Sequence, residues 1–405
     1  MKMNKWTLGL AAAGLVSLPV ASQAEEKPNQ VLTAVANTSI SGYVDTSAHW
    51  NPGTGNANPP RYKFNDASKS DGFNLNVVQL RIEKPPDEGA WAAGYRVDLW
   101  FGPDATVLGT SSLLHSSSDE GSSAGDFAIR QAYVALRMPV GNGIDWKIGV
   151  FDSIIGFESV ESPANPNYTR SYGHSIEPQT HTGVLASYHV NNWFAFSAGV
   201  ANTKGPHINA RAFGEDVKAE SYKTYMGSLT LTAPEDWGWV GGSTLYAGVV
   251  NGLDDNENGA DYDENSTSYY AGGTLNTPLK GLKLGAAFDW LHLHNWSSRT
   301  YGNIGETWAA SGDASFQVAD KLSIHGRAEY LSDKAYTFYS GVPRAKILAL
   351  TGTIQYDLWA NVLSRLEVRW DHSLNSEHFF GGKSDEDEHL KRNEVLVAAN
   401  VIYKF

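Results

Sequence analysis

The chain has 405 residues, a formal net charge of −13 at pH 7 and no cysteine. The acidic balance argues against nucleic-acid binding, which needs a basic surface, and the lack of cysteine excludes disulfide frameworks and thiolate metal sites. After residue 24, no apolar stretch is long enough to cross a membrane as a helix. A membrane-spanning β-barrel stays open, because its strands are apolar on one face only.

The N-terminus has the layout of a secretory signal peptide. Lys2 and Lys5 precede an apolar run from Leu8 to Val20, and a small-residue triplet ends at Ala24, after which we expect cleavage. A membrane anchor helix is disfavoured, because the run is shorter than the roughly 20 apolar residues that a crossing needs. The expected division is a signal peptide, an N-terminal periplasmic segment and a β-barrel, at residues 1–24, 25–37 and 38–405.

From residue 38 onward, apolar and polar residues alternate with the period of a β-strand. Between Trp91 and Phe101, for example, one face is continuously apolar and the other carries Arg96 and Asp98. No comparable 3.6-residue pattern is present. The runs predict sixteen strands, at residues 38–50, 73–84, 90–101, 126–138, 144–152, 179–190, 193–203, 220–233, 241–252, 267–277, 281–295, 306–318, 321–332, 345–357, 361–373 and 392–405.

The connections between these strands predict an all-β, transmembrane antiparallel barrel. Some are short and rich in turn formers, as at 139–143 and 278–281, whereas others are long and polar. An even strand count with short periplasmic turns and long extracellular loops is typical of bacterial outer-membrane barrels. Two long connections, 51–72 and 253–266, are expected to fall out of phase with this alternation. A soluble sandwich of two packed sheets is the alternative fold.

The last strand ends on Phe405, and alternate residues from Val395 onward share its apolar face. A terminal aromatic residue in this position is similar to the assembly signal of outer-membrane barrels. Closure is favoured because hydrocarbon offers no partner to the unpaired amides of an open sheet edge. Aromatic residues near strand ends are then expected to form two interfacial girdles. They are Trp50, Trp91, Trp193, Trp237, Trp239, Trp290, Tyr356, Trp359 and Tyr403.

The same alternation assigns side chains to the lipid face or to the lumen. Ile324 and Val368 fall on apolar faces, so arginine at either position is expected to disturb insertion by about 2–4 kcal/mol. Arg327 falls on a polar face, and its replacement by alanine is expected to be tolerated.

The stretch from Gln131 to Thr203 carries several motifs that point to a known family. They are QAYV at 131–134, GVF at 149–151, GFE at 156–158, PANPNYTRSY at 163–172 and HTGV at 181–184. Through these residues the stretch resembles the OmpL-like putative beta-barrel porin family of bacterial outer membranes. The resemblance implies a porin-like barrel, with no catalytic residue and no defined substrate to carry over. The chain departs from the family pattern at Phe157, where tyrosine is expected, and at Thr169, where serine is common.

Charged residues suggest a constriction inside the barrel. The loop 153–178 is placed like the one that folds into the lumen of general porins and narrows it. An acidic loop opposite a basic wall would set a transverse field across the pore. We expect Glu158 and Glu161 of this loop to face arginines on the second, third and fourth strands. The predicted pore-lining or constriction residues are Glu158, Glu161, Arg170, Arg81, Arg96, Arg130, Arg365 and Arg369.

Local pairing is the alternative interpretation of these charges. In a hydrated lumen the wall arginines would pair with acids on the strands themselves, such as Glu83, Asp98 and Glu367. No transverse field would then result.

Other polar groups are interpreted as solvated surface. The loop from Asp254 to Glu264 begins like a calcium loop, but Asn265 occupies the position of the bidentate ligand. The acidic run at 385–388 is treated in the same way, with cation bridging to lipopolysaccharide as the alternative. His292 and His294 have a chelating spacing, but no third ligand is evident nearby. We therefore expect neither a metal site nor a cofactor.

The sequence thus predicts a non-enzymatic outer-membrane porin for passive diffusion of small polar solutes or ions. A structural or adhesive barrel with a plugged or narrow lumen is the second hypothesis. A barrel lipase is the third, because no glycine-flanked nucleophile and no oriented histidine are found. The expected partners are outer-membrane lipid and lipopolysaccharide, the barrel assembly machinery and the solutes, with a homo-oligomer left open.

Overall fold

The protein is known from a computed structural model that divides it into two units, Met1–Thr38 and Ser39–Phe405. The structure describes residues 37–53, 55–110, 126–212, 220–253, 265–294, 305–335, 337–339, 344–383 and 390–405. The predicted signal peptide and the two acidic segments, 254–264 and 385–388, lie outside these residues. Within them, no helix has both the length and the hydropathy needed to cross a membrane.

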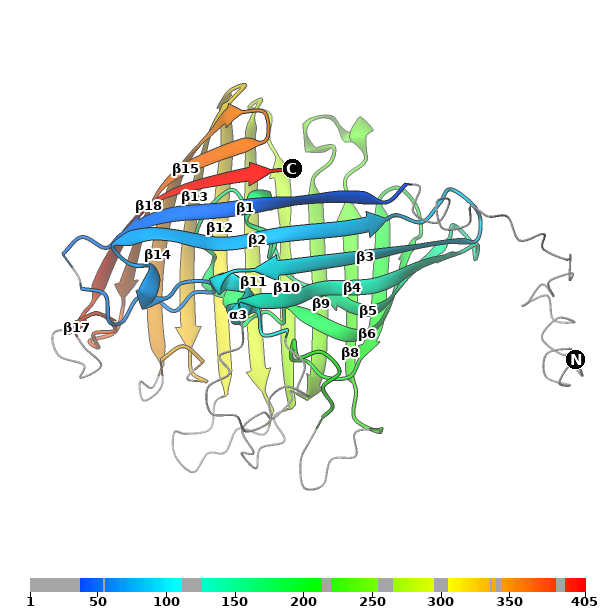
Figure 1. Cartoon of the computed structure of the whole chain (residues 1–405), viewed down its shortest axis with the longest axis horizontal. Helices are drawn as coiled ribbons and strands as arrows, with labels where there is room; N and C mark the ends of the chain where they lie inside the picture. The colour runs from blue at the N-terminus through cyan, green and yellow to red at the C-terminus, as the bar shows by residue number, and fades with distance from the viewer. Residues whose placement is uncertain are drawn as a thin grey trace, which may run out of the picture. The chain divides into compact units, whose positions relative to one another are not determined.

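Sixteen antiparallel strands of the second unit close into a barrel (Figure 1). Consecutive strands pair with each other, and β1 closes the ring by pairing with β18 from Tyr43↔Lys404 to Trp50↔Val397. The sixteen predicted strands are confirmed to within a few residues at their ends. They are β1 (Ser39–Trp50), β2 (Gly72–Lys84), β3 (Ala92–Phe101), β4 (Phe127–Met138), β5 (Ile144–Asp152), β6 (Thr180–His189), β7 (Phe194–Ala201), β8 (Thr224–Thr232), β9 (Thr244–Leu253), β10 (Asn265–Asn276), β11 (Leu282–Leu293), β12 (Glu306–Ala319), β13 (Leu322–Asp333), β14 (Ala345–Trp359), β15 (Val362–Ser373) and β18 (Asn393–Lys404).

The described connections carry the remaining secondary structure. A separate two-stranded sheet is formed by β16 (Phe380–Gly381) and β17 (Leu390–Lys391). Short helices are η1 (Ala67–Lys69), α3 (Pro103–Leu108), η3 (Ser162–Ala164), α4 (Tyr172–Ile176) and η4 (Glu235–Val240).

The connections alternate strictly between the two rims. One rim, which also holds the start of β1 and the end of β18, has the connections 85–91, 139–143, 190–193, 233–243, 277–281, 320–321 and 360–361. The other rim has loop 1 (51–71), loop 2 (102–126), loop 3 (153–179), loop 4 (202–223), loop 5 (254–264), loop 6 (294–305), loop 7 (334–344) and loop 8 (374–392). Loop 1 was expected to fall out of phase, and this was wrong: each antiparallel connection reverses the chain, so order and not length decides the rim. The same expectation for 253–266 falls largely on residues outside the described part.

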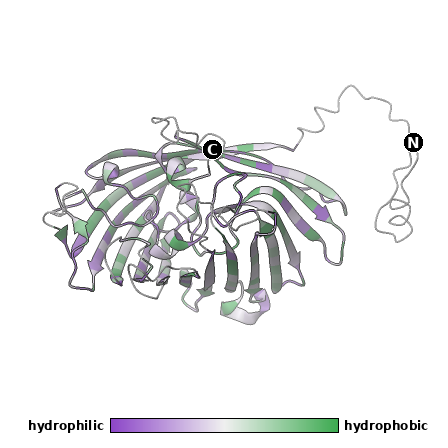
Figure 2. Cartoon of the chain, turned by 90° about the horizontal axis from the view of Figure 1, so that it is seen from below, coloured by the Kyte–Doolittle hydropathy of each residue, from purple (hydrophilic) through white to green (hydrophobic). Residues whose placement is uncertain are grey.

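Hydrophobic and hydrophilic residues alternate along the strands (Figure 2). The large exposed apolar side chains lie on the outer face, and the buried charged ones lie inside. Ile324 and Val368 face outward with 47% and 48% of their surface exposed, whereas Arg327 lies inside and is 3% exposed. Val368 lies in the middle of β15, but Ile324 is the third residue of β13 and lies near the short-turn rim. Two expected members of the girdles are exposed at strand ends: Trp91 directly precedes β3, and Trp359 is the last residue of β14.

Two β-bulges turn extra polar side chains into the lumen. On β4 the register shifts opposite Asp98, so that Arg130 and Gln131 both point inward and both donate to that carboxylate. On β2 the register shifts opposite Asp45, and Asn76, the extra residue, donates to its carboxylate at 2.9 Å. A bulge places two consecutive residues on one face, which regular alternation cannot do.

Apolar clusters fill the inside of the barrel towards the long-loop rim. One joins Tyr62 of loop 1, Tyr172 of loop 3, Phe338 of loop 7 and Phe380 of loop 8 to the inner wall of β12–β14. Another joins Ile155 of loop 3 to the inner wall of β5–β11. The described parts of loops 1, 3, 7 and 8 are therefore packed into the barrel mouth.

Replacing Val368 by arginine should lower the free energy of unfolding by about 2–4 kcal/mol, because a charge at the middle of the lipid face must leave water. Ile324→Arg should cost only about 0–1 kcal/mol, since its side chain can reach the interface. Urea titration in lipid vesicles measures both. Ser197→Arg, which puts the same charge on the lumen side of β7, is the control; an equal loss in all three variants would contradict the assigned faces.

Candidate functional site

Loop 3 crosses the lumen and touches the wall on opposite sides. The carbonyl of Ile154 accepts a hydrogen bond from Tyr246 of β9. Further along the loop, Asn167 accepts from Thr353 of β14 at 2.8 Å, and the Tyr168 hydroxyl lies 2.6 Å from Nε2 of His49 on β1. The expected inward fold of this loop therefore agrees with the structure.

The loop's own sequence sets its path. Asn165 accepts from the amide of Ser159 at 2.8 Å and donates to its carbonyl at 2.7 Å, which closes a tight turn around η3. Ser171 caps α4 by accepting from the amide of His174 at 3.0 Å. Gly156 has a φ of +124°, and a Cβ there would lie 2.5 Å from the carboxylate of Glu177, so only glycine fits.

Glu161 meets the predicted basic wall. Its carboxylate binds Arg81, lies 3.2 Å from Arg96 and 3.1 Å from Arg130. Asp98 of β3 lies at the centre of the same group, 2.9, 2.8 and 2.5 Å from these arginines in turn. The arginines therefore bind the loop acid Glu161 and the strand acid Asp98 together.

The charges of this group differ in their access to water. The side chains of Arg81, Arg96 and Glu161 keep 18–20% of their surface exposed, whereas those of Asp98 and Arg130 are 0% and 2% exposed. Contact between loop and wall leaves no gap for a field to span at this point.

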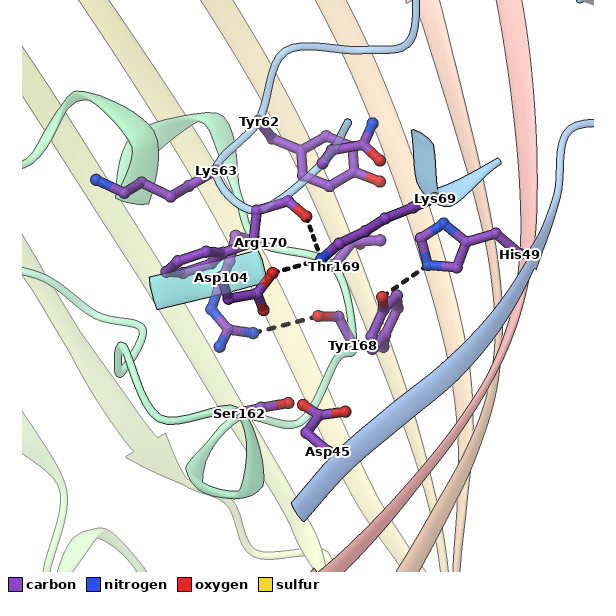
Figure 3. A pocket seen from close by; sticks show the side chains of 12 residues that line it. Asp45, His49, Tyr62, Lys63, Lys69, Asp104, Ser162, Tyr168, Thr169 and Arg170 are labelled. Atoms are coloured by element: carbon purple, nitrogen blue, oxygen red, sulfur yellow. Dashed lines mark hydrogen bonds and ion pairs between the residues drawn. The ribbon is translucent and has the colours of Figure 1, made fainter. Parts of the chain in front are cut away.

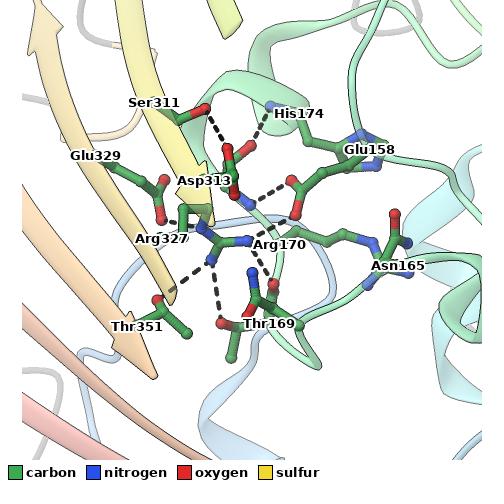
Figure 4. Close-up of polar contacts among 12 residues, drawn as sticks. Glu158, Asn165, Thr169, Arg170, His174, Ser311, Asp313, Arg327, Glu329 and Thr351 are labelled. Carbon is green, nitrogen blue, oxygen red and sulfur yellow. Dashed lines mark hydrogen bonds and ion pairs between the residues drawn. The ribbon is translucent and has the colours of Figure 1, made fainter. Parts of the chain in front are cut away.

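Glu158 does not face the three arginines, and that part of the expectation was wrong. It lies 2.6 Å from Arg327 of β13, which also binds Glu329 at 2.7 Å and donates to the carbonyl of Thr169 at 2.9 Å (Figure 4). Burial acts to raise the pKa of Glu158, but Arg327, together with weaker contributions from His174, Arg170 and Ser171, lowers it to about 2. Because of the turn around Asn165, Glu158 contacts β13 and Glu161 contacts β2–β4.

The other predicted arginines hold the loop and do not line a pore. Arg365 donates to the carbonyls of Ser162 and Asn165, and Arg369 donates to the carbonyl of Arg170 at 2.7 Å. Arg170 itself donates to the carbonyls of Val160 and Tyr168 at 3.0 and 3.2 Å. All three arginines are buried, so their charges do not reach solutes.

Wall acids that the sequence did not single out as site residues bind the backbone of loop 3. Glu367 was expected to pair with an arginine, but it accepts from the amides of Tyr168 and Thr169 at 2.6 and 3.0 Å. Glu329 accepts from the amide of Tyr172 at 2.8 Å. The available signal was an inward-facing glutamate on each of β13 and β15, the two strands that pair with β14.

Loops 1 and 2 are fixed beside loop 3 by a second ionic contact. Lys69 lies 2.5 Å from Asp104 of α3 and donates to the carbonyl of Phe64 at 2.9 Å (Figure 3). Burial raises the pKa of Asp104 to about 6, although Lys69 opposes the shift. The small hollow enclosed by these groups has room for little more than a water molecule.

The wall opposite these ions carries small hydroxyl side chains. Ser187 and Ser197 are 2.8 Å apart across β6 and β7, and Thr244 and Thr274 are 2.9 Å apart across β9 and β10. A hollow of about 300 Å³ opens between this side and loop 3, beside Tyr246. The inner wall thus carries ion pairs on β2–β4 and β13–β15, and hydroxyl pairs beside apolar residues on β6, β7, β9 and β10.

The remaining sequence candidates give no metal site in the described residues. The rings of His292 and His294 are 4.7 Å apart, and Nε2 of His294 lies 2.6 Å from the Thr267 hydroxyl. Across the described part of the chain, no group of three or more histidine, cysteine, aspartate or glutamate residues is arranged to hold a metal ion.

Comparison with known proteins gives both a family and a fold. The family described as "Putative beta-barrel porin-2, OmpL-like" matches residues 37–405, and no curated protein matches the chain. The structure is similar to an anion-selective porin from Comamonas acidovorans (TM-score 0.57, 12% identity, 91% of this chain and 99% of that one). It is also similar to the channel DcaP of Acinetobacter baumannii (0.55, 12%, 91% and 97%) and to OmpT of Vibrio cholerae in its trimer form (0.55, 13%, 91% and 99%).

Arg327→Ala should lower the free energy of unfolding by about 3–5 kcal/mol, because it leaves Glu158 buried without its ion pair. This reverses the expectation of tolerance. Arg81→Ala should cost on the order of 1 kcal/mol, since that pair is partly exposed and Asp98 keeps two other arginines. Adding Glu158→Gln to Arg327→Ala should restore part of the loss. An unfolding midpoint of Arg327→Ala equal to that of the unchanged protein would disprove the anchoring role.

Proposed function

The chain belongs to the putative beta-barrel porin-2, OmpL-like family and is an integral outer-membrane porin; from this premise we propose that small polar solutes and ions diffuse passively along the hydroxyl-rich half of its lumen. The observation that carries the proposal is the contact of Glu161 with Arg81, Arg96 and Arg130. It joins loop 3 to β2–β4, so the proposed water path passes the hydroxyl side chains of β6, β7, β9 and β10, beyond the apolar contacts that the start of loop 3 makes with this wall.

The charged side chains that keep contact with water are of both signs, and we therefore expect the channel to select only weakly between cations and anions. Arg81 and Arg96 are partly exposed next to Glu161, and the same region holds the partly exposed acids Glu83 and Asp152. Cations and anions thus lie within a few ångströms of each other. Paired charges of both signs give no strong field along the path.

A structural or adhesive barrel is the second candidate function. The packing of loops 1, 3, 7 and 8 into the mouth of the barrel favours it, because a filled mouth narrows any path. Conductance in a planar bilayer separates the two functions, since a plugged barrel passes little current.

Enzymatic activity is not part of the proposal. Ser153 lies 3.3 Å from Nε2 of His181, and Ser315 lies 2.9 Å from Nδ1 of His325. The second ring nitrogen of each histidine has no hydrogen-bond partner among the described residues. A serine–histidine hydrolase needs an acid at that nitrogen to orient the ring.

The proposal includes the expected partners. Phe405 ends the chain at the short-turn rim, where its amide donates to the carbonyl of Gly42 at 3.0 Å, and an exposed aromatic ring there is suited to recognition by the assembly machinery. Lipid and lipopolysaccharide would cover the apolar outer face. A homo-oligomer is proposed because one similar structure is described as a trimer; mass measurement in detergent tests it.

Ser197→Trp should reduce single-channel conductance on the order of twofold, because a bulky ring narrows the hydroxyl-rich side. Ala198→Trp puts the same ring on the lipid face of the same strand and should leave conductance unchanged. Planar-bilayer recordings of the refolded full chain measure both. Equal conductance of the two variants would place the water path elsewhere, and no current from the unchanged protein would refute the channel.

Removing charge from the Glu161 group should shift ion selectivity towards ions whose sign is opposite to that of the charge that remains. Glu161→Gln should favour anions, and the double variant Arg81→Gln, Arg96→Gln should favour cations, with smaller shifts at high salt. Glu158→Gln is the matched control, because Glu158 is buried against Arg327 and should leave selectivity unchanged. Reversal potentials across a salt gradient decide; an equal shift in Glu158→Gln would contradict the division between lining and anchoring acids.

A further inference from the structure

A hollow of about 500 Å³ opens on the long-loop side of the barrel, away from the constriction. Loop 1 forms most of its wall, and α3, the residue Ser175 of α4 and loop 7 complete it. Its size lies within the usual range of small-molecule sites. The residues that matter below are Arg61, Lys63, Asp66, Val107, Ser175 and Phe338.

Two cations of loop 1 line this hollow, and neither has an ion-pair partner among the described residues. The Arg61 guanidinium is exposed and lies 5.8 Å from the centre of the Tyr339 ring. The Lys63 amide donates to Ser175 at 2.8 Å, which fixes the backbone. Its side chain extends away from the Lys69–Asp104 pair (Figure 3). Arg61 and Lys63 are thus free to receive an anion.

Two acids lie near these cations, Asp66 in the lining of the hollow and Glu177 beside Lys63, and neither forms an ion pair with them in the described residues. The Asp66 carboxylate accepts from the amide of Ser68 at 2.8 Å and caps its own helix. Burial and the neighbouring carboxylate of Asp289 raise the pKa of Glu177 well above its usual range. Burial lowers the pKa of Lys63 to about 8, a shift that a bound anion would reverse.

The rest of the hollow is mixed in character. Pro59, Val107 and Phe338 contribute apolar surface, and Asn58 and Asn65 contribute amides. Apolar walls with a few convergent polar groups are typical of small-molecule sites. A site of this kind favours a ligand with one anionic group and an apolar body over an inorganic ion.

We propose that this hollow is a binding site for a small organic carboxylate, whose anionic group contacts Arg61 and Lys63 and whose apolar body lies against Val107 and Phe338. The site stands at the long-loop end of the lumen, before the Glu161 group. It would collect organic anions at the entrance of a path that is itself weakly selective. Passage of the bound carboxylate into the lumen depends on the proposed channel function, whereas binding at the hollow does not.

Calorimetry on the full chain in detergent, with benzoate as the probe and benzyl alcohol as its neutral counterpart at constant ionic strength, tests the site. We expect benzoate to bind, benzyl alcohol not to compete, and Lys63→Met to weaken benzoate binding about tenfold by removing one charge-assisted contact. Arg61→Gln should weaken it several-fold. Lys283→Met, which removes an exposed lysine at the short-turn end of β11, is the matched control and should not change the affinity.

Each outcome decides the proposal. The proposal is overturned if benzoate does not bind to the unchanged protein, or if Lys63→Met leaves the benzoate affinity unchanged. It is also overturned if Lys283→Met weakens binding as much as Lys63→Met does, because that result would indicate general attraction by the charge of the lumen. Heat-dependent migration on gels confirms that each variant is folded. Conductance measured without benzoate tests the proposed channel alone, and calorimetry tests the binding site alone. A protein that conducts no current and a protein that binds no benzoate are therefore told apart. If both hold, benzoate should reduce the current more from the long-loop side than from the other.

Discussion

A loop that crosses the inside of a barrel takes its backbone amides out of water, and each amide must then find a partner on the wall or in the loop itself. Here the wall supplies many of these partners as ions. Glu367 accepts from the amides of Tyr168 and Thr169, and Glu329 accepts from that of Tyr172. Charge-assisted hydrogen bonds are roughly twice as strong as neutral ones. The path of loop 3 is therefore set by where the strands carry charge.

The same constraint divides the lumen into two halves. Charges on β13–β15 are buried under loop 3 and cannot act on solutes, and those on β2–β4 reach water only in part. The wall of β6–β10 forms no ion pair with loop 3 in the described residues, and its inner face combines apolar residues such as Leu185 with hydroxyl side chains such as Ser197 and Thr244. A charged wall thus serves here mainly as the support of the loop, and an uncharged wall borders the space that remains.

The strands could be predicted from the sequence because alternation is local: each strand shows its two faces within about ten residues. The destination of a loop acid is not local. Glu158 and Glu161 are three residues apart, yet a turn closed by Asn165 sends one to β13 and the other to β2–β4. The bulge at Arg130 and Gln131 did leave a trace, because two polar residues in a row interrupt the alternation there.

Loop 3 is held by two kinds of contact with different consequences. At its start, Ile154 and Ile155 pack on the apolar inner wall of β6, β8 and β9, and such contacts tolerate sliding because they have no direction. Further along, Arg327 binds Glu158 and Arg369 binds the carbonyl of Arg170, and these contacts fix one register. Buried ion pairs often add little net stability over apolar packing of the same volume. Their effect here is to hold the loop in one position, and the width of the remaining lumen follows from that position.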